Sequence, residues 1–231
     1  MNFYSLVMST PFHWREIGIS SGIAFLSGSV PYGFLIGRSN GIDLRKVGSG
    51  NIGATNVWRV MGKGWGTVAF LFDFAKGFFP VLLARLILGW HETRSLELTL
   101  VFAALAAVLG HNYTPWLGFK GGKGVATSAG VLAARLPAAL GVVLAAWILI
   151  FAATRIVSVA SIVAAALLPF ATWQLYHHRV VFFGFSVAAA ALTIVRHRAN
   201  IGRLLRGEEK RIGAKSVPKT PVSDSSSGPA L

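Results

Sequence analysis

The chain has 231 residues, of which 54% are hydrophobic and only 13% are charged, whereas a soluble domain carries roughly 25% charged residues. Its 22 Lys and Arg residues outnumber its 8 Asp and Glu residues, which gives a net charge of +14. Nucleic acid is the poorest partner for this charge, because so apolar a chain has little polar surface to offer a duplex; anionic lipid and anionic substrates both remain. The absence of cysteine excludes disulfides, thiolate metal sites and an acyl-cysteine intermediate.

Seven apolar segments predict an all-α integral membrane protein with about seven transmembrane helices. They run over residues 17–36, 66–88, 96–109, 125–136, 138–153, 157–176 and 180–195. The third and fourth segments are short and rich in small residues, so five or six spans are alternatives. The first segment has Pro31 and Arg38 where a signal peptide would have a clean cleavage site, and we interpret it as a span.

Loop charge predicts the orientation of these spans. Basic residues concentrate in every second connection, beginning with Arg38, Arg45 and Lys46 and ending with the basic stretch 196–211. Cytoplasmic loops carry the excess of Lys and Arg, so we expect the N-terminus outside and the C-terminus in the cytoplasm. The domain plan is an extracytoplasmic segment over 1–16, one transmembrane domain over 17–212 and a disordered Ser/Pro-rich tail over 213–231.

Four polar segments fall on the cytoplasmic face in this topology, and the first is GSGNIGATNVWR, residues 48–59. Its glycines favour exposed backbone N–H groups that can wrap an anion. Its candidate site residues are Ser49, Asn51, Thr55, Asn56 and Arg59. The segment also contains a literal GxGxxG, but no strand precedes it and no βαβ unit fits among the spans, so a dinucleotide site is rejected.

The second polar segment is GHNYTPWLGFKGGKGVATS, residues 110–128, in which Gly121, Gly122 and Gly124 surround Lys123. It is not a Walker A sequence, because Gly124 stands where Ser or Thr would bind magnesium. Glycine amides, a lysine and a helix beginning near Val125 nevertheless form a phosphate-binding combination. Lys120 is better explained as an anchor at the end of a span.

The third and fourth segments are RIVSVAS, residues 155–161, and RHRANIGRLLRGEE, residues 196–209. Ser158 and Ser161 share a helix face, and so do His197 and Asn200, because each pair is spaced three residues apart. Serines in membrane helices usually serve helix packing, and a basic juxtamembrane helix usually grips anionic headgroups. Neither explanation requires His197 or Asn200.

One charged pair lies inside a predicted span, Asp73 with Lys76 three residues later. Intramembrane charges are costly and are usually paired or functional. Two roles remain open, an internal ion pair and a carboxylate that supports an arginine such as Arg59.

Taken in order, the four polar segments resemble the bacterial acyl-phosphate:glycerol-3-phosphate acyltransferase family over residues 28–209. The resemblance implies seven spans and transfer of an acyl group from acyl phosphate to the 1-hydroxyl of sn-glycerol 3-phosphate, which gives lysophosphatidic acid and phosphate without metal or coenzyme. It implies catalytic roles for Ser49, Thr55, Arg59, Lys123 and His197. It implies substrate binding by a second set, Asn51, Asn56, Gly121, Gly122, Gly124, Ser158, Ser161 and Asn200.

The resemblance also implies a location and partners. We expect a multi-pass protein of the bacterial cytoplasmic (inner) membrane with its site facing the cytoplasm. Its partners would be acyl phosphate, glycerol 3-phosphate, the lipid bilayer and the soluble enzyme that makes acyl phosphate.

Two other classes share part of this pattern. A small organic-anion transporter has similar spans and basic loops, but its site lies near the midplane between repeats, and this sequence shows no inverted repeat. A lipid-binding scaffold would leave the glycine-rich loops without a purpose.

Overall fold

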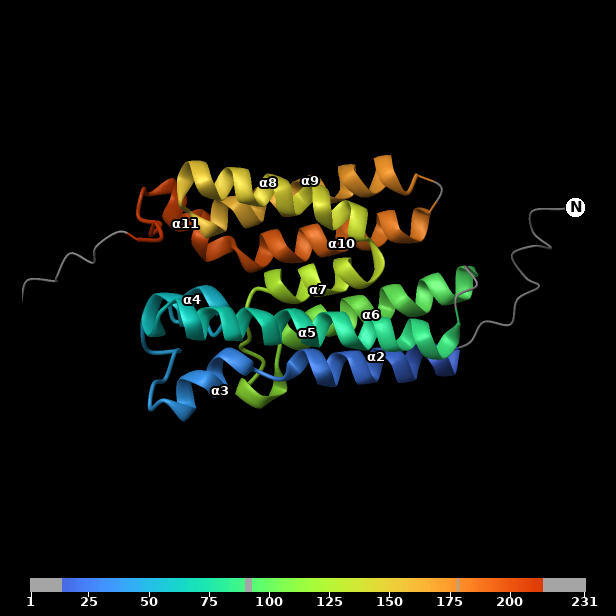
Figure 1. Ribbon diagram of the computed structural model, residues 1–231, viewed down its shortest axis with the longest axis horizontal. Helices are drawn as coiled ribbons and strands as arrows, with labels where there is room; N and C mark the ends of the chain where they lie inside the picture. Colours follow the sequence, from blue (N-terminus) through green and yellow to red (C-terminus); the bar gives the residue numbers. More distant parts are fainter. Residues whose placement is uncertain (1–13, 90–92, 178, 214–231) are drawn as a thin grey trace, which may run out of the picture.

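The computed structural model describes residues 14–89, 93–177 and 179–213, and all regular secondary structure in these ranges is helical (Figure 1). The longer helices are α2 (Trp14–Ser29), α5 (Lys63–Leu88), α6 (Arg94–Asn112), α8 (Pro137–Thr154), α9 (Val157–Leu175) and α10 (Val180–Arg196). The shorter ones are α3 (Tyr32–Ser39), α4 (Ala54–Met61), the 3₁₀ turn η1 (Pro115–Leu117), α7 (Val125–Arg135) and α11 (Arg198–Leu205).

Five spans meet the length and hydropathy expected of a membrane crossing within the described ranges. They are Trp14–Ser39, Lys63–Leu88, Arg94–Leu117, Pro137–Thr154 and Val157–Leu175. A sixth arises if α10 and α11, bent by 56° at their junction, count as one broken span. The fourth predicted span, residues 125–136, corresponds to α7, whose 11 residues extend over only about 17 Å, too short to cross a hydrocarbon core about 30 Å thick. The total of seven stays a prediction.

The first span is broken between α2 and α3. Pro31 lacks an N–H group, so the carbonyl groups at the end of α2 need other donors. Thr114 Oγ1 donates to the Ser29 carbonyl oxygen at 2.6 Å, and Lys76 Nζ donates to the Val30 carbonyl oxygen at 2.7 Å. The break is therefore satisfied by side chains from α5 and from the segment after α6, as a membrane interior requires.

Close helix packing at small residues holds the bundle together. A Cβ atom at Gly28 of α2 would lie 2.1 Å from the carbonyl oxygen of Ala107 in α6. A Cβ atom at Gly77 of α5 would lie 2.2 Å from the carbonyl oxygen of Thr127 in α7. Because these backbones touch directly, van der Waals packing supplies the cohesion that the hydrophobic effect cannot supply between helices in lipid.

The short polar elements gather at one end of the bundle. Figure 1 shows α3, α4 and α11 together at the end opposite the start of α2. This arrangement fits the prediction that the polar segments share one face. The predicted terminal segments 1–16 and 213–231 lie mostly outside the described residues, and α2 begins at Trp14, inside the predicted 1–16 segment.

Candidate active site

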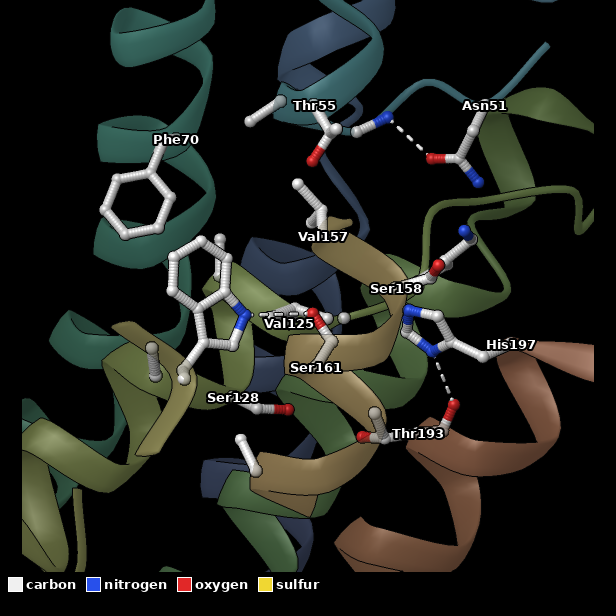
Figure 2. Close-up of a pocket in the computed structure, with 18 of the residues that line it drawn as sticks. Asn51, Thr55, Phe70, Val125, Ser128, Val157, Ser158, Ser161, Thr193 and His197 are labelled. Atoms are coloured by element: carbon white, nitrogen blue, oxygen red, sulfur yellow. Dashed lines mark hydrogen bonds between the residues drawn. The ribbon is translucent and has the colours of Figure 1, made fainter. Parts of the chain in front are cut away.

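A cavity of about 680 Å³ lies where the four polar segments converge. Its walls come from the loop before α4 and from α4 to α11, so segments up to about 160 residues apart in the sequence share it. Eleven of the thirteen predicted site residues line this cavity, and Gly121 and Gly122 do not. Figure 2 shows Asn51, Thr55, Ser158, Ser161 and His197 around it.

The loop before α4 is shaped by two asparagine side chains. Asn56 Oδ1 accepts a hydrogen bond from the Ser49 N–H at 2.8 Å, and Asn56 Nδ2 donates to the carbonyl oxygens of Leu44 and Val47. Asn51 Oδ1 accepts from the Gly53 N–H at 2.8 Å, ahead of the first turn of α4. Both asparagine side chains thus form hydrogen bonds with the backbone of their own loop, and these bonds fix the position of Ser49.

Thr55 and Arg59 reach the cavity from α4 because their spacing of four residues places them on one helix face. Burial, reinforced by the charge of Arg203 and opposed by Glu209, lowers the pKa of Arg59 from its usual value. An arginine side chain stays charged under such a shift. The α4 face therefore presents one hydroxyl group and one permanent cation to the cavity.

In the glycine loop between η1 and α7, Lys123 lines the cavity, whereas Gly121 and Gly122 do not. The N–H groups of Gly121 and Gly122 donate to the carbonyl oxygens of Asn112 and His111, both at 3.1 Å. These two amides are consequently unavailable to an anion. Gly124 has a φ of +81° and starts α7, whose first N–H groups lack partners within the helix and form an anion-binding end next to Lys123.

Lys123 belongs to a network of charged and amide groups. Its Nζ donates to Asn200 Oδ1, and Asn200 Nδ2 donates to Glu209 Oε1. The same carboxylate accepts from Ser158 Oγ at 2.8 Å and from Arg203 Nε at 2.6 Å. Asn200 thereby connects the glycine loop to the C-terminal segment, and Ser158 contacts that segment from α9.

The titration of this network follows from its burial and charge. Burial, with added repulsion from Arg203 and Arg59, lowers the pKa of Lys123 to about 8 although Glu209 opposes the shift. Burial raises the pKa of the Glu209 carboxyl, but the hydrogen bonds that it accepts outweigh burial, so its pKa lies below the usual value. Glu209 was not among the predicted site residues. Its signal in the sequence was an acid inside the basic stretch 196–211, where a headgroup-binding helix needs none.

The remaining predicted residues stand on α9 and at the end of α10. Ser161 Oγ accepts a hydrogen bond from Trp147 Nε1 at 3.1 Å. His197 Nδ1 lies 2.8 Å from the carbonyl oxygen of Thr193 (Figure 2). A carbonyl oxygen can only accept, so Nδ1 carries the proton, and Nε2 of the neutral ring is an acceptor.

One wall of the cavity is apolar. Phe70 of α5 faces the polar side chains across the cavity in Figure 2. The cavity lining also includes Leu132 of α7, Leu144, Trp147 and Phe151 of α8, and Leu168 of α9. The site therefore combines a cationic end with a surface suited to hydrocarbon.

The structure also decides between the two roles left open for Asp73. Asp73 Oδ1 lies 2.7 Å from Lys76 Nζ, and both side chains are buried. The two residues form an internal ion pair on α5, and within the described residues the recorded partners of Asp73 are Lys76 and His111, not Arg59. In the same ranges no group of three or more His, Cys, Asp or Glu residues is placed to hold a metal ion.

Apolar spans around a cavity with a cationic end and an apolar wall define an integral membrane protein whose site suits an amphiphilic anion. The model of one protein family, glycerol-3-phosphate acyltransferase, matches residues 19–207. The chain belongs to the glycerol-3-phosphate acyltransferase family, and it is an integral membrane acyltransferase. The family resemblance stated from the sequence is confirmed.

Curated relatives and solved structures agree with this assignment. Glycerol-3-phosphate acyltransferases from Thermosynechococcus vestitus and Desulforudis audaxviator are 46% and 47% identical, over 86% and 82% of this chain and 96% and 92% of theirs. Crystal structures of PlsY, an integral membrane glycerol 3-phosphate acyltransferase, superpose with TM-scores of 0.78 for the glycerol 3-phosphate form and 0.76 for the lysophosphatidic acid form. These structures are 42% and 41% identical, each over 85% of this chain and over 96% and 95% of theirs.

Proposed function

We propose that the protein transfers a fatty acyl group from acyl phosphate to the 1-hydroxyl of sn-glycerol 3-phosphate, giving lysophosphatidic acid and inorganic phosphate. The observation that carries this proposal is the single cavity in which Arg59, Lys123 and Arg203 meet an apolar wall. Both substrates of the reaction bear a phosphate, and one also bears a hydrocarbon chain. The names of the relatives support glycerol 3-phosphate as the acceptor.

The chemistry needs alignment and charge stabilisation more than a strong base. The hydroxyl oxygen of glycerol 3-phosphate attacks the acyl carbonyl carbon, the bond from that carbon to the phosphate oxygen breaks, and the hydroxyl proton passes to a substrate phosphate. Arg59 and Lys123 neutralise the two phosphates. Ser49, Thr55 and the first amides of α7 stabilise charge on the carbonyl oxygen and on the departing phosphate.

The other site residues hold the substrates and the cations in place. His197 offers Nε2 to a glycerol phosphate hydroxyl, and Asn200 fixes the ammonium group of Lys123 through its side-chain oxygen. Asn51 and Asn56 act through the loop that carries Ser49, and Gly124 starts the helix that faces the anion. Ser158 and Ser161 anchor two residues of the cavity lining, Glu209 and Trp147.

The test uses purified protein in detergent or lipid with palmitoyl phosphate and glycerol 3-phosphate, and it follows phosphate and lysophosphatidic acid together. Equal formation of both products is expected, and palmitoyl-CoA should not replace palmitoyl phosphate. Transfer from palmitoyl-CoA but not from palmitoyl phosphate would contradict the proposed donor. Saturable binding of glycerol 3-phosphate without any product would instead favour an organic-anion transporter.

We further propose that the protein lies in the bacterial cytoplasmic membrane with its site facing the cytoplasm. Because the chain has no cysteine, a single introduced thiol reports its own accessibility. The exposed Lys46, in the loop between α3 and α4, is a suitable position. Lys46→Cys should resist a membrane-impermeant maleimide in intact spheroplasts and react in inverted vesicles; the opposite pattern would reverse the orientation.

A further inference from the structure

The side chain of His111 explains why residue 122 is a glycine. A Cβ atom at Gly122 would lie 2.1 Å from Nε2 of His111, and the next two nearest atoms are also atoms of the imidazole ring. The φ angle of Gly122 is not in the left-handed region, so its backbone conformation suits any residue. Gly122 therefore lacks a side chain because the imidazole of His111 occupies that space.

The imidazole ring of His111 contacts the ion pair on α5. His111 Nδ1 lies 3.5 Å from Asp73 Oδ1, and Asp73 Oδ1 lies 2.7 Å from Lys76 Nζ. Lys76 Nζ also donates to the Val30 carbonyl oxygen at the break in the first span. Asp73, Lys76 and His111 are 2%, 5% and 5% exposed, and Asp73 and His111 also line the cavity, so this chain of contacts lies in the wall of the site.

Arg196 also holds the glycine loop, through two of its backbone carbonyl oxygens. Its Nη2 donates to the carbonyl oxygens of Gly121 at 2.9 Å and of Gly122 at 2.7 Å, and its Nε donates to the Gly122 carbonyl oxygen at 3.1 Å. Gly122 thus contacts the guanidinium group of Arg196 through its carbonyl oxygen and the imidazole ring of His111 at its Cα atom. Lys123, the next residue, points into the cavity from this clamped peptide.

We propose that Asp73 and His111 are positioning residues that set the place of the glycine loop, and with it the aim of Lys123, through contact of the imidazole with Gly122. This inference rests on the proposed function, in which Lys123 neutralises a substrate phosphate. Asp73 and His111 act through the loop, and the ion pair of Asp73 with Lys76 keeps the ring in one orientation. A displaced loop would move the ammonium group relative to the phosphate and weaken phosphate binding before it unfolds the protein.

A double-mutant cycle at the contact tests this directly. Gly122→Ala should push the loop away from the ring. A displacement of about 1 Å can lower kcat/KM by about a hundredfold, and we expect a loss of that order. His111→Ala, which leaves the Asp73–Lys76 pair intact, should cost less, about tenfold, because it removes a support without adding a clash. In the double variant His111→Ala/Gly122→Ala the new methyl group enters the space left by the ring, so activity should recover about tenfold relative to Gly122→Ala alone.

Gly121→Ala is the matched control. Its Cβ atom would lie 2.0 Å from the backbone carbonyl oxygen of His111, which His111→Ala does not remove. Adding His111→Ala should therefore rescue Gly122→Ala and fail to rescue Gly121→Ala. Rescue of both, or of neither, would overturn the proposal.

Phosphate affinity separates positioning from a loss of fold. The inhibition constant of inorganic phosphate against palmitoyl phosphate, and its dissociation constant from calorimetry, should rise in Gly122→Ala and fall back in the double variant. Unchanged phosphate binding in folded Gly122→Ala protein, monitored by size exclusion and thermal unfolding, would contradict the positioning role. Wild-type protein that binds phosphate but makes no product would refute the proposed function, while the phosphate measurements would still decide this inference.

Discussion

The two glycine-rich loops of the site have similar compositions but require glycine for different physical reasons. In the loop before α4, Gly48 and Gly50 have φ angles of +66° and +72°, a conformation that side chains disfavour. In the loop before α7, Gly121 and Gly122 have ordinary φ angles but touch α6, where a Cβ atom would lie within 2.1 Å of His111 atoms. The first loop needs glycine for its conformation, and the second needs glycine for space.

The difference extends to what holds each loop and to what each loop offers. Side chains within the first segment, Asn51 and Asn56, shape it locally, so it depends on its own sequence. Backbone carbonyl groups of α6 and the guanidinium of Arg196 shape the second, so it depends on tertiary packing. One glycine-rich loop of the cavity is therefore shaped by its own sequence and the other by tertiary packing, and substitutions should separate the two.

The largest effect should follow removal of the charge that the loop before α7 presents. Lys123→Ala should lower kcat/KM by about 10²–10³-fold, because solvent cannot replace the half-buried ammonium group that we propose neutralises a substrate phosphate. Lys120→Ala is the control, since Lys120 is exposed three residues away and does not line the cavity. Near-normal turnover of well-expressed Lys123→Ala protein would remove Lys123 from the mechanism.

A smaller effect should distinguish conformation from contact in the loop before α4. Gly48→Ala places a methyl group 2.2 Å from Asn56 Oδ1, in addition to its left-handed φ angle. Gly41→Ala has a φ of +74° but open space around it, so it should cost only the conformational term, about 1–2 kcal/mol. Thermal unfolding should show Gly48→Ala as the less stable of the two, and only Gly48→Ala should impair turnover; equal behaviour would mean that the Asn56 contact is unimportant.

The smallest effect concerns pH. The pKa of Lys123 is lowered to about 8. Its side chain is therefore positively charged below that pH and loses this charge as the pH rises through it. Substrate phosphates are already dianionic there, so kcat/KM of the wild type should decline above about pH 8. Lys123→Arg should be less active overall but should lack this decline, because arginine stays charged. A pH–rate profile with the same alkaline limb in both proteins would assign that limb to another group.

Hydropathy located most of the fold because each long helix must be apolar along its length. Predicted segments 66–88, 138–153 and 157–176 differ from α5, α8 and α9 by at most three residues at either end. It missed the break in the first span, which depends on donors from Lys76 and Thr114 far along the chain. It cannot decide whether α7 is a span, because composition does not show how an 11-residue helix is enclosed by its neighbours.

The site was predicted as a set of residues but not as a set of contacts. The predicted topology and the family resemblance assigned Ser49, Arg59, Lys123 and His197 to one site, and all four line one cavity. They did not reveal that the amides of Gly121 and Gly122 are used by α6, because those bonds follow from how the loop folds back. Glu209 escaped notice for a similar reason, since its partners Ser158 and Asn200 meet it only in the folded protein.

The ion pair within α5 has a consequence for how the protein enters the membrane. Asp73 and Lys76 are three residues apart on one helix and already adjacent, so this span carries its own counter-ion. A lone charge near the centre of a span costs about 2.5–3.5 kcal/mol on insertion scales. Because the two charges cancel within one turn, we expect the middle of α5, between Lys63 and Arg85, to pass from the translocon into lipid without a net charge, before α6 delivers His111 to the same place.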